Sequence, residues 1–219
     1  DIEKVTWSLD GKAVATGNYS GVVRVWSVSD GSPLQEISTG MGPIGNLTFI
    51  RKNTLAVVGT SGYLLVLNSE TGREITHLRT HNLTQGVLDV SRGGKTLVTG
   101  SGDGSLKLVN TDKLLVPTVL WHEADVRHAA FIRNDGELLT ADSSGKLTSW
   151  NLADGTSKRI HEDKESIRLC STQRNGSLAA TVGASNAVSI YNCETGDLAA
   201  TVNVPGSDGV ATSAGSPDT

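Results

Sequence analysis

The histidines and one glycine-rich run are the residues of this chain whose types and spacing most resemble a metal-binding or phosphate-binding site. The histidines stand at His77, His81, His122, His128 and His161. Residues 122–128, with the sequence HEADVRH, combine imidazole and carboxylate groups, which are ligands that Zn²⁺ takes in proteins. This run crosses from a loop into an alternating strand pattern, and alternate residues of a strand point to opposite faces. We therefore expect structural histidines and no metal site.

The glycine-rich run at residues 100–104, GSGDG, is similar in composition to a phosphate-binding loop. Such a loop ends in Lys-Ser or Lys-Thr and opens a helix, and neither feature follows here. We expect a turn between two strands instead. Gly-X-Ser-X-Gly, Cys-X-X-Cys and His-Glu-X-X-His motifs are also absent from the sequence. The sequence therefore predicts no catalytic residue and no cofactor.

The elements that hold these residues follow from a repeat that runs along the chain. An aromatic or apolar anchor recurs at intervals of 41, 42, 41 and 41 residues, at Trp26, Leu67, Val109, Trp150 and Tyr191. Five positions before the anchors lie Gly21, Gly62, Gly104, Gly145 and Asn186, which are residues that favour turns. Ten positions before them, in short apolar runs, lie Thr16, Val57, Thr99, Thr140 and Thr181. A period of about 40 to 45 residues is typical of the four-stranded blades of a β-propeller.

Three segments carry a resemblance to a known family. They are residues 7–11 (WSLDG), 22–26 (VVRVW) and 99–109 (TGSGDGSLKLV), and with the period they resemble the WD40 repeat family over nearly the whole chain. The Trp-Asp pair of that family is altered in every repeat, because the anchors are followed by Ser27, Asn68, Asn110, Asn151 and Asn192. The resemblance implies an all-β fold, a WD40-type β-propeller, with loops on which peptides and partner proteins dock.

The resemblance also implies a buried network of His, Ser or Thr, Asp and Trp in each blade. The third repeat matches it in part, with His81, Thr99, Asp103 and Val109. The fourth repeat also matches it in part, with His122, Thr140, Ser144 and Trp150. Val109 stands in place of the tryptophan and Ser144 in place of the aspartate. We therefore expect the blades to depend more on packing than on this network, with the structural residues Trp26, Asp103, Trp150 and Tyr191.

The repeat divides the chain into blades and a remainder. We expect five four-stranded blades within residues 1–202, at about 1–39, 40–80, 81–121, 122–161 and 162–202. Residues 203–219 then form a linker with the first strand of a sixth repeat, or a tail, because Ser216-Pro217-Asp218 matches Ser8-Leu9-Asp10. Most proteins of the WD40 family have seven blades, so we expect a piece of a larger, seven-bladed propeller. A closed ring of five blades and an open propeller completed by a partner's strands are the alternatives.

A surface for partners follows from strand direction. In a blade of antiparallel strands, the loops before the first strand and after the second strand share one edge. This edge, the loop rim, collects the candidate partner-binding residues Lys4, Tyr19, Asn46, Thr60, Gln85, Asp125, Arg127, Ser143 and Lys164. Because Tyr and Arg often anchor protein interfaces, Tyr19 and Arg127 are the first candidates.

Composition narrows the classes of partner. The formal net charge is −4 and the pI is about 5.7, so the surface as a whole does not attract nucleic acid or anionic membranes. No apolar run reaches the roughly 18 to 20 residues of a membrane-spanning helix. Cys170 and Cys193 are separated by a whole strand of the predicted fifth blade, which is too far for a disulfide. Reduced thiols favour a cytoplasmic or nuclear protein.

We therefore expect a non-enzymatic scaffold or adaptor that presents the loop rim to peptide or protein partners in a larger multiprotein complex. One alternative is a subunit of an RNA-associated assembly, ribonucleoprotein or translational, that uses a basic patch such as Arg51-Lys52 or Lys158-Arg159. Another is a propeller enzyme with a site at the ring axis. The partners include, in the case of an open ring, the chain segment or protein that completes the propeller.

Overall fold

The computed structural model describes residues 1–82, 85–113, 118–162, 165–173, 175–185 and 187–203. Throughout these ranges the regular elements are β-strands, which confirms the all-β prediction. Since no helix occurs among the described residues, none there is long and apolar enough to cross a membrane. The chain divides into two compact units, Asp1–Val119 and Leu120–Thr219.

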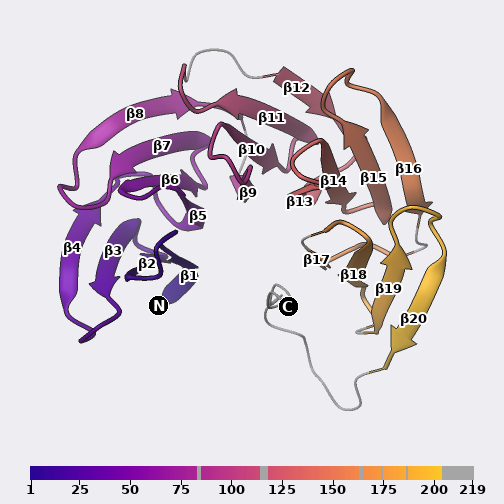
Figure 1. Ribbon diagram of the computed structural model, residues 1–219, viewed down its shortest axis with the longest axis horizontal. Coiled ribbons are helices and arrows are strands. Elements are labelled where there is room, and N and C mark those ends of the chain that lie inside the picture. The colour runs from indigo at the N-terminus through magenta and orange to yellow at the C-terminus, as the bar shows by residue number, and fades with distance from the viewer. Residues whose placement is uncertain (83–84, 114–117, 163–164, 174, 186, 204–219) are drawn as a thin grey trace. The chain divides into compact units, whose positions relative to one another are not determined.

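The first unit contains the sheets of the first three repeats, named here blades 1, 2 and 3 (Figure 1). Blade 1 consists of β1 (Ile2–Trp7), β2 (Ala13–Asn18), β3 (Val22–Ser27) and β4 (Pro33–Ser38). Blade 2 consists of β5 (Ile44–Arg51), β6 (Thr54–Gly59), β7 (Tyr63–Asn68) and β8 (Glu74–Arg79). Blade 3 consists of β9 (Gln85–Val90), β10 (Thr96–Ser101), β11 (Ser105–Asn110) and β12 (Thr118–Trp121), whose last residues enter the second unit.

The second unit contains blades 4 and 5. Blade 4 consists of β13 (Val126–Ile132), β14 (Glu137–Asp142), β15 (Lys146–Asn151) and β16 (Ser157–Glu162). Blade 5 consists of β17 (Leu169–Thr172), β18 (Leu178–Val182), β19 (Val188–Asn192) and β20 (Leu198–Val202). In every blade four strands pair in chain order. The predicted start of a sixth repeat, Ser216-Pro217-Asp218, lies outside the described residues.

The repeating anchors lie near the end of the third strand of each blade. The antiparallel register sets each anchor opposite an apolar residue of the second strand, in the pairs Trp26 with Val14, Leu67 with Leu55, Val109 with Leu97, Trp150 with Leu138 and Tyr191 with Ala179. Side chains directly opposite each other in a sheet are in contact. The period read from the sequence therefore marks one recurring cross-strand contact.

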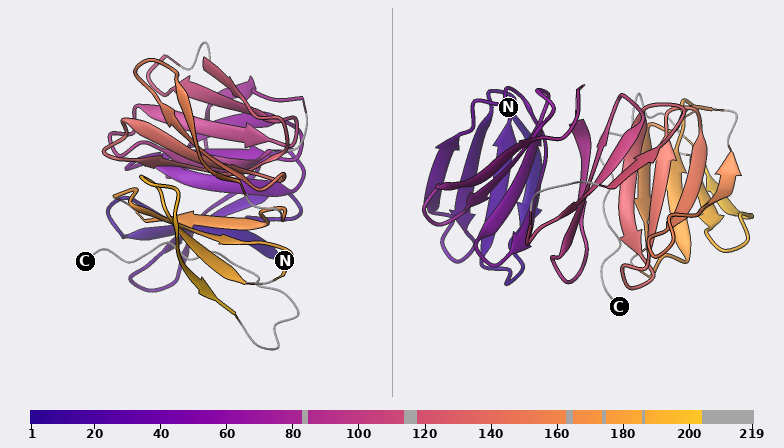
Figure 2. Two further views of the ribbon diagram at one scale, coloured as in Figure 1. Left: turned by 90° about the vertical axis from the view of Figure 1, so that its right-hand side faces the viewer. Right: turned by 90° about the horizontal axis from the view of Figure 1, so that it is seen from above.

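The hydrophobic cores lie between neighbouring blades of a unit. Blade 2 supplies both of its faces, since alternate residues of β6 point in opposite directions. Leu55 and Val57 pack in the cluster shared with blade 1, and Ala56 and Val58 in the cluster shared with blade 3, all with no exposed surface. The blades of the first unit stack face to face in this way (Figure 2). In the second unit one cluster joins blades 4 and 5 through Leu139, Ala141, Leu147, Cys170, Tyr191 and Cys193.

Candidate functional site

Blade 4 holds a complete polar network between its strands. His122 Nδ1 lies 3.0 Å from Asp142 Oδ2, and His122 Nε2 lies 2.8 Å from Thr140 Oγ1. Trp150 Nε1 donates to the same Thr140 oxygen at 2.9 Å. The prediction that Ser144 interrupts this network is wrong, because Asp142 supplies the carboxylate from two residues earlier. Ser144 supports it by donating from Oγ to Asp142 Oδ1 at 2.6 Å.

Asp142 is held as an ionised acceptor inside the blade. Its side chain has no exposed surface, and burial alone would raise its pKa. Hydrogen bonds from the Ser144 hydroxyl, the Lys146 amide and His122 outweigh burial and keep the pKa of Asp142 below its usual range. A carboxylate that is enclosed and occupied in this way orients its neighbours, and so the network is structural.

Blade 3 contains the same network without the tryptophan. His81 Nε2 lies 2.9 Å from Thr99 Oγ1, and His81 Nδ1 lies 2.8 Å from Ser105 Oγ. Ser105 in turn donates from Oγ to Asp103 Oδ1 at 2.5 Å, which fits the structural role expected of Asp103. Burial lowers the pKa of His81 to about 4, so the imidazole is neutral at physiological pH. Val109, only 1% exposed, fills the anchor position by packing.

The anchors of blades 1 and 5 also make specific side-chain contacts. Trp26 Nε1 donates to Thr16 Oγ1 at 3.0 Å within blade 1. Tyr191 of blade 5 stacks on His161 with 4.1 Å between the ring centroids. His161 lies inside β16, where it pairs with Leu147, and it joins blades 4 and 5 by this stacking.

The two histidines within residues 122–128 lie in different surroundings. His122 belongs to the blade 4 network, whereas His128 lies on β13, where burial lowers its pKa to about 4. Among the residues that the structure describes, no three His, Cys, Asp or Glu side chains come together as metal ligands would. His81 and His122 belong to hydrogen-bonded networks, and His161 stacks on Tyr191.

The loop rim of the first unit lies along matching edges of its sheets. The register there pairs Lys4 with Gly17, Asn46 with Val58 and Gln85 with Ser101. Lys4 and Thr60 are exposed, and Tyr19 has 66% of its surface exposed. Asn46 has a structural contact, because its Nδ2 donates to the main-chain oxygen of Gly86 at 3.2 Å and so links blades 2 and 3.

The second unit has a rim of its own at the start of β13 and the end of β14. The Ser143 amide donates to the main-chain oxygen of Asp125 at 2.8 Å, which fixes the two loops against each other. Arg127 Nη2 lies 3.4 Å from Asp125 Oδ2, and about half of each side chain is exposed. Lys164, the last predicted rim residue, lies outside the described residues.

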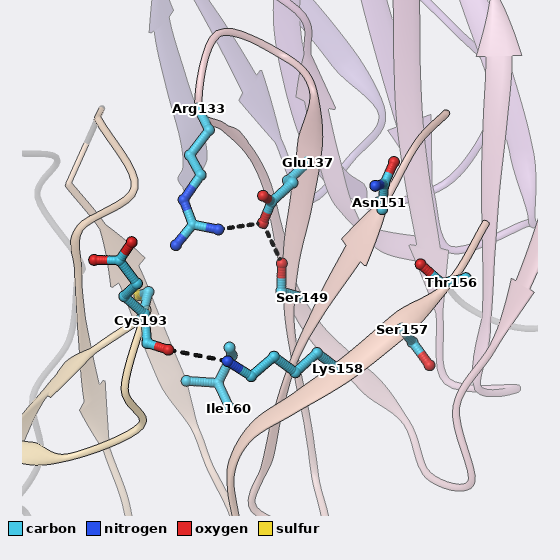
Figure 3. A pocket seen from close by; sticks show the side chains of 10 residues that line it. Arg133, Glu137, Ser149, Asn151, Thr156, Ser157, Lys158, Ile160 and Cys193 are labelled. Atoms are coloured by element: carbon cyan, nitrogen blue, oxygen red, sulfur yellow. Dashed lines mark hydrogen bonds and ion pairs between the residues drawn. The ribbon is translucent and has the colours of Figure 1, made fainter. Parts of the chain in front are cut away.

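A polar pocket of about 190 Å³ opens in the second unit between blade 4 and the turn after β19 (Figure 3). Arg133 Nη1 and Ser149 Oγ both donate to Glu137 Oε2, each at 2.6 Å. Lys158 Nζ donates to the main-chain oxygen of Glu194 at 3.0 Å and so ties β16 to blade 5. Of these five residues, the sequence analysis named only Lys158, as part of the basic pair considered for RNA binding.

A left-handed turn carries Arg133 to the edge of this pocket. Arg133, Asn134 and Asp135 have φ angles of 50°, 56° and 65°. This conformation costs roughly 1–2 kcal/mol for each residue other than glycine. Corresponding turns of other blades use glycine at positive φ, in Gly11, Gly94 and Gly176. The hydrogen bond between Arg133 and Glu137, which raises the pKa of the arginine, helps to hold the turn.

A signal for the pocket is present in the repeat. The residues one position before the anchors are Val25, Val66, Leu108, Ser149 and Ile190. The residues thirteen positions before the anchors are Ala13, Thr54, Thr96, Glu137 and Leu178. Ser149 is the polar member of the first set and Glu137 the charged member of the second. A comparison of repeats position by position would therefore have identified both.

The arginines of the two basic pairs considered for RNA binding form ion pairs with acidic side chains. Arg51 forms an ion pair with Asp112, and Arg159 Nη1 lies 2.5 Å from Glu162 Oε2. Lys158 is bonded to the main chain of Glu194, as described above. A neighbouring carboxylate thus matches the charge of each arginine.

Comparison with known proteins connects these repeats to a family. The family model "WD domain, G-beta repeat" matches residues 1–27 and 72–110, which contain the first three strands of blades 1 and 3. The chain is 31% identical over 116 residues to the anaphase-promoting complex subunit cdh1 of Dictyostelium discoideum, over 50% of this chain and 15% of that protein. It is 28% identical over 116 residues to the protein FIZZY-RELATED 3 of Arabidopsis thaliana, over 50% of this chain and 24% of that protein.

A longer match covers more of both chains. The target of rapamycin complex subunit wat1 of Schizosaccharomyces pombe is 23% identical over 169 residues, which cover 75% of this chain and 54% of that protein. The chain thus spans between 15% and 54% of the length of these three relatives. The family model falls on repeats that the period and the strands define independently, and these repeats are of the WD40 type.

Proposed function

We propose that the chain is a non-enzymatic interaction scaffold that presents its loop rim to a peptide or protein partner within a larger complex, in the cytoplasm or nucleus. Two relatives are named as subunits of complexes, the anaphase-promoting complex and the target of rapamycin complex. The single observation that carries the proposal is the exposed aromatic ring of Tyr19 on the rim of blade 1. Tyrosine is enriched among residues that dominate binding energy at interfaces.

The backbone around Tyr19 is held in place before any partner arrives. Val22 donates its amide to Asn18 Oδ1 at 2.9 Å, and the Gly21 amide donates to the Asn18 main-chain oxygen at 3.2 Å. These bonds close the turn between β2 and β3 on which the ring stands. A preorganised turn loses little conformational entropy on binding, so the exposed ring can contribute most of its contact energy to affinity.

Arg127 offers a polar anchor on the rim of blade 4. Its pair with Asp125 is half exposed and 3.4 Å long, and exposed pairs contribute about 0–1 kcal/mol. A carboxylate of a partner can therefore replace Asp125 at small cost. The amide of Ser143 holds the Asp125 loop by its main chain, so the rim keeps its shape during the exchange.

The proposal is tested by comparing the proteins retained by wild type, Tyr19→Ala and Arg127→Ala from native extracts of cells that express the chain. We expect each variant to lose about tenfold or more in affinity for the retained partner, with the melting temperature unchanged. Lys12→Ala is the matched control, since Lys12 is exposed in the turn at the opposite edge of blade 1. Unchanged retention by both rim variants would contradict the proposal.

We further propose that the face of blade 1 turned away from blade 2 is covered by a further blade or by strands of a partner, as in a larger propeller. Val5 and Trp7 of β1 are 64% and 62% exposed on this face. Size-exclusion chromatography with light scattering on the 219-residue chain should show association that Trp7→Ser disperses. A compact monomer would instead support a five-bladed ring.

A further inference from the structure

The pocket beside Glu137 lies at the opposite edge of blade 4 from the loop rim. Val126 pairs with Asp142 at the rim end of the strands, and Glu137 pairs with Asn151 at the other end. The rim proposed above makes no use of this pocket. We propose that the pocket binds an uncharged amide, the side chain of an Asn or Gln residue, on a partner polypeptide.

The charges of the pocket cancel. Arg133 and Lys158 are balanced by Glu137 and Glu194 among its lining residues. The hydrogen bond from Arg133 keeps the pKa of Glu137 below its usual range, so this carboxyl is ionised at neutral pH. A carboxylate ligand would meet Glu137 as a like charge, and an ammonium ligand would meet Arg133 and Lys158. A neutral group avoids both repulsions and loses less hydration on entry.

The hydrogen-bonding groups of the pocket match an amide. Both donors to Glu137 end on Oε2, which leaves Oε1 able to accept a further hydrogen bond. Arg133 has five N–H groups and donates one to Glu137, and Lys158 has three and donates one to Glu194. An amide presents one carbonyl acceptor and an NH₂ donor group on adjacent atoms. It can therefore accept from Arg133 or Lys158 while it donates to Glu137.

The corresponding junction of blades 1 and 2 shows that the architecture alone does not require this polarity. There Gln35 Nε2 donates to the main-chain oxygen of Glu70 at 2.9 Å, as Lys158 does to Glu194. The positions equivalent to Glu137 and Ser149 are Ala13 and Val25, which pack in the hydrophobic cluster. The polar lining is thus a property of blade 4 itself.

The remaining walls suit the carbon atoms of the same ligand. Ile160 is 9% exposed and Cys193 is 1% exposed, and both line the pocket. Figure 3 shows Arg133, Glu137 and Ser149 on one side and Lys158 with Ile160 on the other. The methylene groups of a Gln or Asn side chain can lie on this apolar surface while its amide reaches the polar groups. A pocket of about 190 Å³ admits one side chain and not a folded element.

The test uses three peptides that differ in one side chain, Ac-Gly-Gln-Gly-NHCH₃, Ac-Gly-Glu-Gly-NHCH₃ and Ac-Gly-Lys-Gly-NHCH₃, whose N-methylamide ends leave the Gln side chain as the primary amide. Each is titrated into the full chain and followed by NMR at the Arg133 Nε–H, the Asn151 side-chain amide and the Cys193 backbone amide. We expect millimolar binding of the Gln peptide, at least about fivefold tighter than the Glu and Lys peptides. Tighter binding of either charged peptide, or equal binding of all three, would overturn the proposal, as would no response at these groups.

Variants taken from blade 1 separate recognition from folding. Glu137→Ala with Ser149→Val installs the residues of the blade 1 junction, and it should abolish the response to the Gln peptide in a chain that still melts cooperatively. Tyr19→Ala should leave the response unchanged, so failure here is distinguishable from failure of the rim proposal. A double variant that still binds the Gln peptide would contradict the assignment even if its fold is intact.

Discussion

Blades 1 and 4 share the same hydrogen bonds between strands and differ in the side chains at the junction with the next blade. Each ends its third strand in a tryptophan that donates to a threonine of the second strand, Trp26 to Thr16 and Trp150 to Thr140. Each also donates from its fourth strand to a main-chain oxygen of the next blade. Val25 of blade 1 packs in a hydrophobic cluster, whereas the equivalent Ser149 of blade 4 donates to a carboxylate.

Two residue positions distinguish the apolar junction between blades 1 and 2 from the polar pocket of blade 4. Where blade 1 has Ala13 and Val25, blade 4 has Glu137 and Ser149, which hydrogen-bond to each other. The strand pairing stays the same, because it depends on the backbone. WD40 blades can therefore acquire pockets without any change in fold.

The largest difference between the two blades is expected at the tryptophans. Trp150 is 9% exposed, bonded to Thr140 and in edge contact with His122 at 5.5 Å between centroids. Trp150→Ala should lower the free energy of unfolding by about 3–5 kcal/mol. Trp26 is only partly buried, and Trp26→Ala should cost about 1–3 kcal/mol. Urea denaturation of both variants measures the difference, and an equal or larger loss for Trp26→Ala would remove this distinction.

An intermediate effect is expected where the junction residues are exchanged. Val25→Ser removes apolar contact from a site only 3% exposed and buries a hydroxyl among apolar side chains. It should lower the free energy of unfolding by about 2–4 kcal/mol. Ser149→Val removes one hydrogen bond and adds apolar surface, so it should change stability by less than about 1 kcal/mol. Thermal melts of the two variants test this asymmetry. Similar losses in both would mean that the two junctions are packed alike.

The smallest effect is expected on the pH dependence of stability, through the carboxyl group of Glu137. The pKa of Glu137 is lowered from its usual 4.5, first by the hydrogen bond from Arg133, so its stabilising contribution is present above that value. The contribution is lost as pH falls through the folded-state pKa. Arg133→Gly removes the partner and relieves the left-handed turn, and it should make stability less dependent on pH as the pH falls below 4.5. NMR titration of the Glu137 carboxyl checks this directly, and an unshifted pKa in wild type would contradict it.

The fold could be predicted from the sequence because each anchor marks a local, repeated contact within one sheet. Asp142 was missed because a fixed count from Trp150 reaches Ser144, although a carboxylate two residues earlier can also reach His122. The pocket was missed for a different reason. Glu137 and Ser149 differ from their equivalents in the other repeats, but the pocket also depends on Glu194 and Cys193, which come from the next blade and carry no signal in the repeat of blade 4 itself.

The bonds that Gln35 and Lys158 make between blades end on main-chain oxygens. The main-chain carbonyl is the same in every type of residue. The acceptor therefore remains whatever side chain stands at Glu70 or Glu194. Substitutions at these two positions can therefore accumulate without loss of the hydrogen bond between neighbouring blades. The outer turns are thereby available for mutational drift, and new specificities can arise on them while the repeats stay joined.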